Sequence, residues 1–489
     1  MVSTVTASSS AVAIIGGGFG GIAAAVNLLR RGIDDFTIFE AGEHPGGTWW
    51  HNRYPGCEVD IPSLCYSFSF IDYDWPSTHG SRDELLRYTD AVVERFGLLP
   101  HFRLGTRIDS IEWLDEEDLW LVTPRGGAPQ RFRFVISALG LLSDPKIPDW
   151  PGLADFEGVA FHTQHWDEAP DLRGRRVAVV GTGSTAVQVV PAIAEDAAHV
   201  TVFQRQPGWV LPKGERPYTE AERERYRRSP WRFRIDRWRA FHEAFKPKHF
   251  QAGTADNAAA QAACRAFIEE SIEDPAIRAA VTPAYPWGCK RPVFSTTFYP
   301  SLNRANVTLV PKAVARVTQR GVVDADGVEH EADVLILSTG FQPTRFLSTL
   351  RVTGPGGLDL HEAWGERPTA YLGITVPGFP NLFICYGPNT NGGYAITSML
   401  ERQAEVAARA IRTAIRRGAT VDTSPEATRR WTAWVERMID EHMSAGNDPG
   451  CTNYYHSASG ANVTQWPLSA FQYWRVTRFP APGAFRFGP

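Results

Sequence analysis

The sequence predicts an α/β protein with two doubly wound units of parallel strands and helices, the second inserted in the first, together with a helical insertion. Two stretches share one pattern: AVAIIGGGFGGIAAAVNLLRRG at residues 11–32 and RVAVVGTGSTAVQVVPAIA at residues 176–194. Each is an apolar, β-branched run, then a glycine-rich turn, then a segment with helical spacing. A pattern typical of the first unit returns after about residue 375, which indicates the insertion.

Further apolar runs of strand length fill out both units. They are residues 36–41, 134–140, 200–205, 333–341 and 381–389. Joints rich in glycine and proline, at residues 143–153 and 375–380, separate the units and predict a hinge between them. The resulting assignment is 1–150 and 375–489 for the first unit, 165–213 and 286–374 for the second, and 214–285 for the helical insertion.

The helical insertion changes in composition to Arg, Glu, Trp and Ala. Its large apolar residues recur at steps of three and four, which predicts one apolar helix face; they are Trp231, Ile235, Trp238, Phe241 and Phe245. Three interpretations stay open for this face. It packs on the second unit, it forms a wall of a substrate channel, or it belongs to a basic helix at a membrane surface.

The first glycine-rich turn has the spacing of a dinucleotide site. Gly16, Gly18 and Gly21 form GxGxxG directly after a strand, with Phe19 inside the turn. Glycine lets the turn close and lets the backbone approach a pyrophosphate, whose charge lies at the positive end of the next helix. Glu40 ends the following strand, at the distance expected for an acid that binds a ribose.

The second turn reads GxGxxA, and Arg205 stands near the end of its following strand, where an acid would otherwise be expected. A guanidinium there can pair with a 2′-phosphate, although Arg205 could also be a surface charge. We therefore expect two Rossmann-like domains, with FAD on the first and NADPH on the second. The expected contacts of the second domain are Gly181, Thr182, Gly183, Ser184, Thr185, Ala186 and Gln188.

Composition argues against several other classes of protein. A net charge of -4 with 21% charged residues lacks the basic excess of a nucleic-acid binder. The apolar run near the N-terminus is interrupted by glycines and follows no basic segment, so we expect neither a signal peptide nor a membrane span. The expected location is cytoplasmic, and the oligomeric state stays open.

The cysteines give no metal or disulfide pattern. There are six, with no CxxC and no cluster with histidine: Cys57, Cys65, Cys264, Cys289, Cys385 and Cys451. We expect all six to be reduced, buried thiols. The lack of a dithiol pair disfavours a disulfide reductase.

A stretch without strand or helix period, FEGVAFHTQHWD at residues 156–167, precedes the second unit. It resembles the FxGxxxHxxxW(P/D) motif of type I Baeyer-Villiger monooxygenases, which are class B flavoprotein monooxygenases. The matching residues are Phe156, Gly158, His162, Trp166 and Asp167. The related flavin-containing monooxygenases usually end this motif in Tyr or Phe, so Trp166 favours the first family. We assign His162 and Trp166 to domain positioning or to packing.

A second motif of that family, GGxWxxxx(F/Y)PGxxxD, is matched by GGTWWHNRYPGCEVD at residues 46–60. It places Gly47, Thr48 and Trp49 among the expected FAD contacts. By the same resemblance, Asp60 would interact with an active-site arginine, although an aspartate before a proline turn could also be a turn former.

The family's Lys-Arg pair falls on Lys290 and Arg291 in YPWGCKRPVF. The resemblance implies that Lys290 helps to bind the 2′-phosphate and that Arg291 lies over the flavin beside the nicotinamide. The alternative is a solvated basic pair. Gln206 departs from the Ser or Thr that relatives commonly carry after the arginine, which puts a second phosphate contact in doubt.

The resemblance implies a specific reaction. NADPH reduces FAD, reduced flavin adds O2, and the flavin C4a-peroxide attacks a ketone to give an ester or lactone. A buried guanidinium at Arg291 would stabilise the negative charge, and Asp60 would orient it. Alternatives are an N- or S-monooxygenase of amines or sulfides, and a redox sensor or binding protein without oxygenase activity. The identity of the ketone is open.

Overall fold

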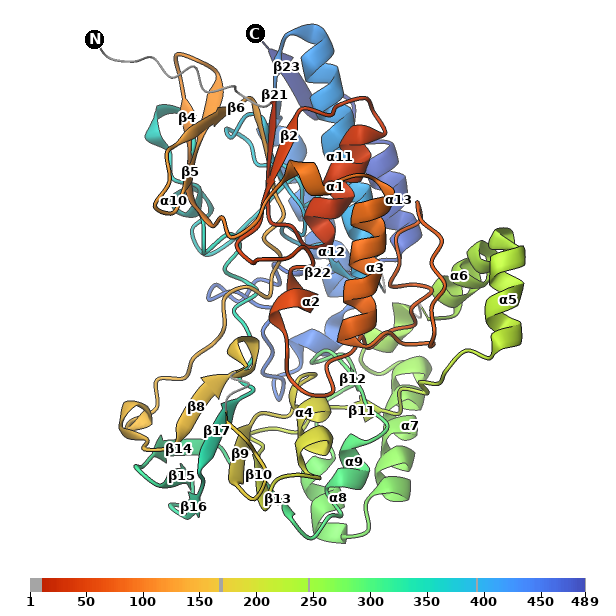
Figure 1. The fold of residues 1–489 in the computed structure, drawn as a ribbon, viewed down its shortest axis with the longest axis vertical. Coiled ribbons are helices and arrows are strands. Elements are labelled where there is room, and N and C mark those ends of the chain that lie inside the picture. The colour runs from red at the N-terminus through yellow and green to blue at the C-terminus, as the bar shows by residue number, and fades with distance from the viewer. Residues whose placement is uncertain (1–10, 167–169, 245–246, 393–394, 489) are drawn as a thin grey trace.

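The computed structural model describes residues 11–166, 170–244, 247–392 and 395–488. Two five-stranded parallel sheets form its centre, the first in the upper half of Figure 1 and the second in the lower half. The predicted α/β class with two Rossmann-like units is confirmed.

The first sheet has the strand order β19-β7-β1-β2-β3. Its strands are β1 (Val12–Ile15), β2 (Phe36–Phe39), β3 (Phe102–Arg103), β7 (Phe134–Ser137) and β19 (Leu382–Ile384). Helix α1 (Phe19–Leu29) follows β1 and packs against α11 (Ile396–Arg417) from the far end of the chain. Strand β19 and helix α11 therefore belong to the first unit, although they follow all strands of the second sheet in the sequence.

The second sheet has the order β13-β10-β9-β17-β8. Its strands are β8 (Val159–His162), β9 (Arg176–Val180), β10 (His199–Phe203), β13 (Val307–Val310) and β17 (Val334–Leu337). Helix α4 (Ala186–Ile193) follows β9. Since all of these elements lie between β7 and β19 in the sequence, the second unit is inserted in the first.

Smaller elements flank the two sheets. At the upper left of Figure 1, β4 (Ile108–Leu114), β5 (Leu119–Pro124) and β6 (Gln130–Phe132) pair antiparallel in one sheet. Strand β18 (Arg351–Thr353) joins this sheet parallel to β4. Another sheet joins β14 (Val314–Val317), β15 (Gly321–Asp324) and β16 (Glu329–Glu331). Short strand pairs are β11 (Val210–Leu211) with β12 (Val293–Phe294), β20 (Asn391–Gly392) with β22 (Gln465–Trp466), and β21 (Thr420–Thr423) with β23 (Phe485–Gly488).

The remaining helices cover both units. They are α2 (Thr48–His51), α3 (Arg82–Arg95), α9 (Phe298–Ser301), α10 (Leu360–Trp364), α12 (Pro425–His442) and α13 (Ala470–Arg478).

The two glycine-rich turns share one backbone conformation at their first glycine. Gly16 has φ +107° and Gly181 has φ +118°, values that favour glycine. A Cβ on Gly16 would lie 2.5 Å from the carbonyl oxygen of Ala138, and one on Gly181 would lie 2.4 Å from that of Ser338. Each turn therefore passes against the residue that follows the neighbouring parallel strand, which only glycine permits.

The insertion comprises α5 (Glu220–Arg228), α6 (Pro230–Ala244), α7 (Ala255–Ser271) and α8 (Pro275–Val281). The prediction that the apolar face of α6 packs on the second unit is wrong for three of its residues. Trp231 is 57% exposed, Ile235 40% and Trp238 66%. The helix instead buries Phe233 in the hydrophobic core of the first unit. The fifth predicted residue, Phe245, lies outside the described residues.

We expect Gly16→Ala to lower the free energy of unfolding of the first unit by about 2 to 5 kcal/mol, because it adds a clash to backbone strain. The matched control is Gly32→Ala, since Gly32 also has positive φ but a Cβ there would meet nothing within 4 Å. The control should cost about 1 kcal/mol. Urea unfolding of both variants measures the difference, and equal losses would contradict the steric argument.

Candidate functional site

The two units meet along a seam formed by residues 54–60 of the first unit. The Tyr54 hydroxyl donates to Oε1 of Gln188 at 3.2 Å, and Nε2 of Gln188 donates to the carbonyl oxygen of Glu58 at 3.0 Å. Gln188 lies in the helix that follows the second glycine-rich turn. A pocket of about 640 Å³ opens along this seam, with Arg53, Arg82 and Ser295 in its walls. The predicted cofactor residue Gln188 therefore joins the units.

Asp60 and Arg291 form an ion pair across the seam, with Nη2 of Arg291 3.2 Å from Oδ2 of Asp60. The Asp60 side chain is 10% exposed and that of Arg291 is 48% exposed. Burial raises the pKa of Asp60, an effect that Arg291 and Lys213 partly offset. Burial lowers the pKa of Arg291. The charge of Asp60 and nearby tyrosines raise it by more, so the pKa of Arg291 lies above its usual value. The pair thus holds a permanent cation at the mouth of the seam.

Three tyrosines that the sequence analysis did not predict lie close enough to Arg291 for its charge to affect their pKa values. Burial raises the pKa of Tyr66 to about 12, and it raises those of Tyr386 and Tyr455, while Arg291 opposes each shift. Nε1 of Trp49 donates to the Tyr66 hydroxyl at 3.2 Å, and the Tyr386 hydroxyl donates to Oδ1 of Asn391 at 2.9 Å. All three hydroxyls remain protonated at neutral pH, and the single proton of the Tyr386 hydroxyl is already donated to Asn391.

Lys213 is a second cation that sequence reasoning missed. Its side chain is fully buried, and its Nζ lies 2.6 Å from Oε1 of Glu58. Burial and the Lys213 charge lower the pKa of nearby His79 to about 4, so this histidine is neutral at physiological pH. Lysine is rarely buried without a partner, but that signal exists only in the folded protein.

The first glycine-rich turn is held by Glu40. Its two carboxylate oxygens accept backbone N–H bonds from Gly17 and Gly42, each at 2.7 Å. A Cβ on Gly47 would lie 2.9 Å from the Cα of Gly18, so the backbones of these two glycines are in direct contact at the start of α1. This cradle of bare backbone at a helix N-terminus fits a pyrophosphate.

Four further predicted residues lie in or beside this cradle. Thr48 and Trp49 begin α2 directly after Gly47, and the Phe19 ring packs 5.5 Å from that of Tyr66. Gly21 is buried inside α1, where a Cβ would meet the carbonyl oxygen of Gly16 at 1.9 Å. Gly21 thus serves the close packing of the turn on its helix.

The second glycine-rich turn has free space at its middle glycine, whereas the first turn is in contact with Gly47 there. A Cβ on Gly183 would meet nothing within 4 Å, and Gly183 is exposed just before α4. The side chains of Thr182, Ser184 and Thr185 are half-buried around it, while Ala186 is buried. The turn therefore offers backbone and hydroxyl donors to free space, which fits a second dinucleotide phosphate.

Arg205 and Lys290 lie close together although 85 positions separate them in the sequence. Arg205 is exposed after β10, and Nζ of the half-buried Lys290 lies 5.2 Å from the centre of the Tyr285 ring. Burial and the charge of Arg205 lower the pKa of Lys290 to about 8. Two neighbouring cations match the dianionic character of a phosphate.

The motif at residues 156–167 lies at the end of β8 and the start of a linker. Nε2 of His162 donates to the carbonyl oxygen of Gly340 at 3.1 Å, and its Nδ1 accepts from the N–H of Gln164 at 3.1 Å. The Trp166 ring packs edge-on against Phe161. These contacts fix the linker to the second sheet, whereas Asp167 lies outside the described residues.

The expectation of six reduced thiols is wrong for two cysteines. Cys289 and Cys451 form a disulfide between residues 162 positions apart, whereas the other four cysteines are free and buried. Sequence spacing gave no signal because a bridge depends on distance in space rather than along the chain. The disulfide ties the residue before Lys290 to the segment that carries Tyr455. Nε2 of Gln206 also contacts this segment, donating to the carbonyl oxygen of Gly450 at 2.9 Å.

Comparison with known proteins agrees with this arrangement. Residues 13–228 match the family model described as pyridine nucleotide-disulphide oxidoreductase. A Baeyer-Villiger monooxygenase of Streptomyces coelicolor is 39% identical over 478 residues, which are 96% of this chain and 90% of that protein. One of Pseudomonas aeruginosa is 37% identical over 480 residues, 96% of this chain and 89% of that protein.

Solved structures show the same similarity. The crystal structure of cyclohexanone monooxygenase from Rhodococcus sp. Phi1 bound to NADP+ superposes with a TM-score of 0.85 at 33% identity. The match covers 98% of this chain and 99% of that one. The OTEMO complex with FAD and NADP superposes with a TM-score of 0.87 at 27% identity, again over 98% and 99% of the two chains.

The disulfide predicts a redox-dependent stability. Dithiothreitol should lower the free energy of unfolding by about 2 to 5 kcal/mol, because it removes a long-range crosslink. The double variant Cys289→Ser/Cys451→Ser is the matched control and should be insensitive to dithiothreitol. Thermal unfolding with and without the reductant measures this effect, and a native midpoint that does not move would contradict the expectation.

Proposed function

Because this chain belongs to the Baeyer-Villiger monooxygenase family, we propose that it inserts one oxygen atom of O2 beside the carbonyl of a small-molecule ketone, giving an ester or lactone. It is an FAD-dependent monooxygenase that takes its electrons from NADPH. Bound FAD would supply the redox chemistry, since it would accept a hydride from NADPH and activate O2. The observation that carries the proposal is the Arg291–Asp60 pair at the seam between the two dinucleotide cradles.

We assign to Arg291 the stabilisation of negative charge on the reacting oxygen atoms. Its guanidinium stays charged at physiological pH and can donate several hydrogen bonds at once. Asp60 holds it by the 3.2 Å contact, and that contact also limits the cost of burying Asp60. Hydrogen-bond donors fixed before the reaction are worth most in a site that excludes water.

We assign the FAD to the first unit and the NADPH to the second. The expected FAD contacts are Gly16, Gly18, Phe19, Gly21, Glu40, Gly47, Thr48, Trp49 and Asp60. The expected NADPH contacts are the turn from Gly181 to Ala186 together with Gln188, Arg205 and Lys290. Although both Glu40 oxygens accept backbone bonds, each retains a lone pair for a ribose hydroxyl.

The unit boundaries follow the same assignment. We propose that residues 1–150 and 375–489 form the FAD-binding domain, that 165–213 and 286–374 form the NADP-binding domain, and that 214–285 form the helical insertion. We further propose that the protein works in the cytoplasm, where NADPH is supplied.

The direct test is turnover of the FAD-loaded protein with NADPH and a panel of ketones, sulfides and amines, with products identified by mass spectrometry. Cyclohexanone belongs in the panel because it is the substrate named for the similar solved enzymes. Esters or lactones from ketones support the proposal. Oxygenated sulfides or amines without any ester would identify an N- or S-monooxygenase, and hydrogen peroxide as sole product would argue against oxygenase activity altogether.

Arg291→Ala should lower ester formation by about 100-fold or more, in the range found when a transition-state donor is removed. Reduction of the flavin by NADPH, followed anaerobically by absorbance, should continue. Arg291→Lys keeps a charge but loses the planar donors, so its rate should lie between those of the native protein and Arg291→Ala. Undiminished ester formation in Arg291→Ala would remove this residue from the proposed role.

Arg205→Ala should weaken NADPH binding by roughly 10-fold to 150-fold, which corresponds to about 1.5 to 3 kcal/mol. Binding of NADH should hardly change, because NADH lacks the 2′-phosphate. Titration of both cofactors by fluorescence checks this difference. Equal losses for the two cofactors would show that Arg205 does not contact the phosphate.

Lys290 predicts a pH dependence of NADPH binding. Because the pKa of Lys290 is lowered to about 8, the ammonium is present below pH 8 and is lost as the pH rises above it. A bound phosphate favours the charged form, so NADPH affinity should fall with rising pH above 8, by at most about tenfold per pH unit. Lys290→Arg should remove this dependence, and NADH should not show it. A flat NADPH profile in the native protein would contradict the assignment.

A further inference from the structure

We propose that helix α6 attaches this protein to the surface of an anionic lipid bilayer through Trp231, Ile235 and Trp238. The inference goes beyond the proposed reaction and does not depend on it. It rests on which residues α6 exposes, where α6 lies and which charges surround the exposed residues.

The exposed apolar residues share one face of α6. Steps of four and three residues place Trp231, Ile235 and Trp238 on one side of a helix, and all three are among the most exposed large apolar residues that the structure describes. Phe233 lies on the other side, 5% exposed, where it packs into the first unit. The body of the protein therefore already holds α6 by one face, while the opposite face presents two indole rings to solvent.

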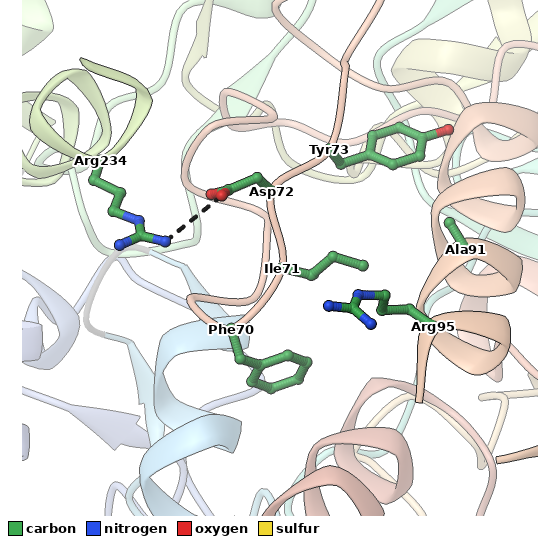
Figure 2. Close-up of a pocket in the computed structure, with 7 residues that line it drawn as sticks. All are labelled: Phe70, Ile71, Asp72, Tyr73, Ala91, Arg95 and Arg234. Atoms are coloured by element: carbon green, nitrogen blue, oxygen red, sulfur yellow. Dashed lines mark ion pairs between the residues drawn. The ribbon is translucent and has the colours of Figure 1, made fainter. Parts of the chain in front are cut away.

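The position of α6 makes this face accessible to a flat surface. In Figure 1, α5 and α6 project from the right-hand edge of the protein, beyond both sheets. The helix is held there by the buried Phe233 and by Nη2 of Arg237, which donates to the carbonyl oxygen of Ser67 at 2.7 Å. Figure 2 shows the exposed ion pair of Arg234 with Asp72 beside it. A helix that projects in this way can meet a bilayer.

Arginines border the apolar face on both sides. At 100° per residue, Arg232 and Arg239 lie along one edge of the face and Arg234 lies along the other. The Arg239 and Arg234 side chains are 63% and 69% exposed, and the Arg232 guanidinium lies 5.2 Å from the centre of the Trp231 ring. Such side chains can reach lipid phosphates while the indoles enter the interface between headgroups and acyl chains.

The local charge matches an anionic partner. Residues 228–248 hold seven basic and two acidic residues, in a chain with a net charge of -4. The ion pairs of Arg234 with Asp72 and of Arg239 with Asp236 are exposed and thus weak, so phosphates can replace the carboxylates. The cytoplasmic leaflet is the anionic surface that a cytoplasmic enzyme would meet.

Other partners fit less well. Pairing of α6 with a second copy would bring the arginine rows of both copies together, which repel each other. A single-stranded nucleic acid needs a basic groove that follows its backbone, whereas the Trp231 face lies on a convex helix. Among the described residues, no helix is long and apolar enough to cross a bilayer, so the attachment would be to its surface.

The test is co-sedimentation of the FAD-loaded protein with vesicles of phosphatidylcholine alone or with about one-third phosphatidylserine, at about 0.1 M and about 0.5 M salt. We expect binding to the anionic vesicles, weakened at least tenfold by the higher salt. The double variant Trp231→Ser/Trp238→Ser should bind at least tenfold more weakly. Arg232→Gln/Arg239→Gln should lose most of the preference for anionic vesicles.

The matched control is Leu99→Ser/Val328→Ser, which removes two exposed apolar side chains outside α6, 60% and 53% exposed. This control should bind as the native protein does. FAD content and NADPH oxidation without vesicles verify that each variant is folded. The proposal is overturned if the native protein does not sediment with anionic vesicles, or if the α6 variants and the control bind equally. It is also overturned if the α6 variants instead abolish a dimer or binding to single-stranded DNA.

Discussion

The contact between the two units is the constraint on which the rest of this structure depends. One short loop, residues 54–60, carries a group of these polar contacts, because it receives Gln188, Lys213 and Arg291 from the second unit. Each dinucleotide cradle is complete within its own unit. This loop, together with the Cys289–Cys451 disulfide and the bond from Gln206 to Gly450, restrains the distance and angle between the cradles. A hydride donor and its acceptor can react only when both are aligned.

The seam contains two ion pairs between the units. Asp60 and Glu58 each pair with a cation of the second unit, which offsets the cost of burying the carboxylates. Polar interfaces between domains permit relative motion more readily than large apolar ones. The Cys289–Cys451 disulfide works in the opposite sense, because it ties the loop of Arg291 to the segment that carries Tyr455. The site therefore combines a movable seam with one covalent tie.

Helix α6 of the insertion contacts the first unit on one face and solvent on the other. Helix α6 is bound to the first unit through Phe233 and Arg237, although it is inserted in the sequence of the second. It thereby adds contacts between the units on a side away from the cradles. Its outer face then carries tryptophans bordered by arginines, a combination that a helix buried in the protein would not need.

The sequence by itself determined the features that follow from local physics. The strands, both glycine-rich turns, Glu40 and Arg205 were predictable because backbone sterics and short-range spacing demand these residue types. Similarity to a known family added Asp60 and Arg291, which are 231 positions apart and which no local pattern connects. Only the tertiary structure decided that Cys289 meets Cys451, that Lys213 is buried beside Glu58, that tyrosines surround Arg291, and which face of α6 meets solvent. Each of these depends on chain segments brought together across long sequence distances, and a spacing rule carries no information about such contacts.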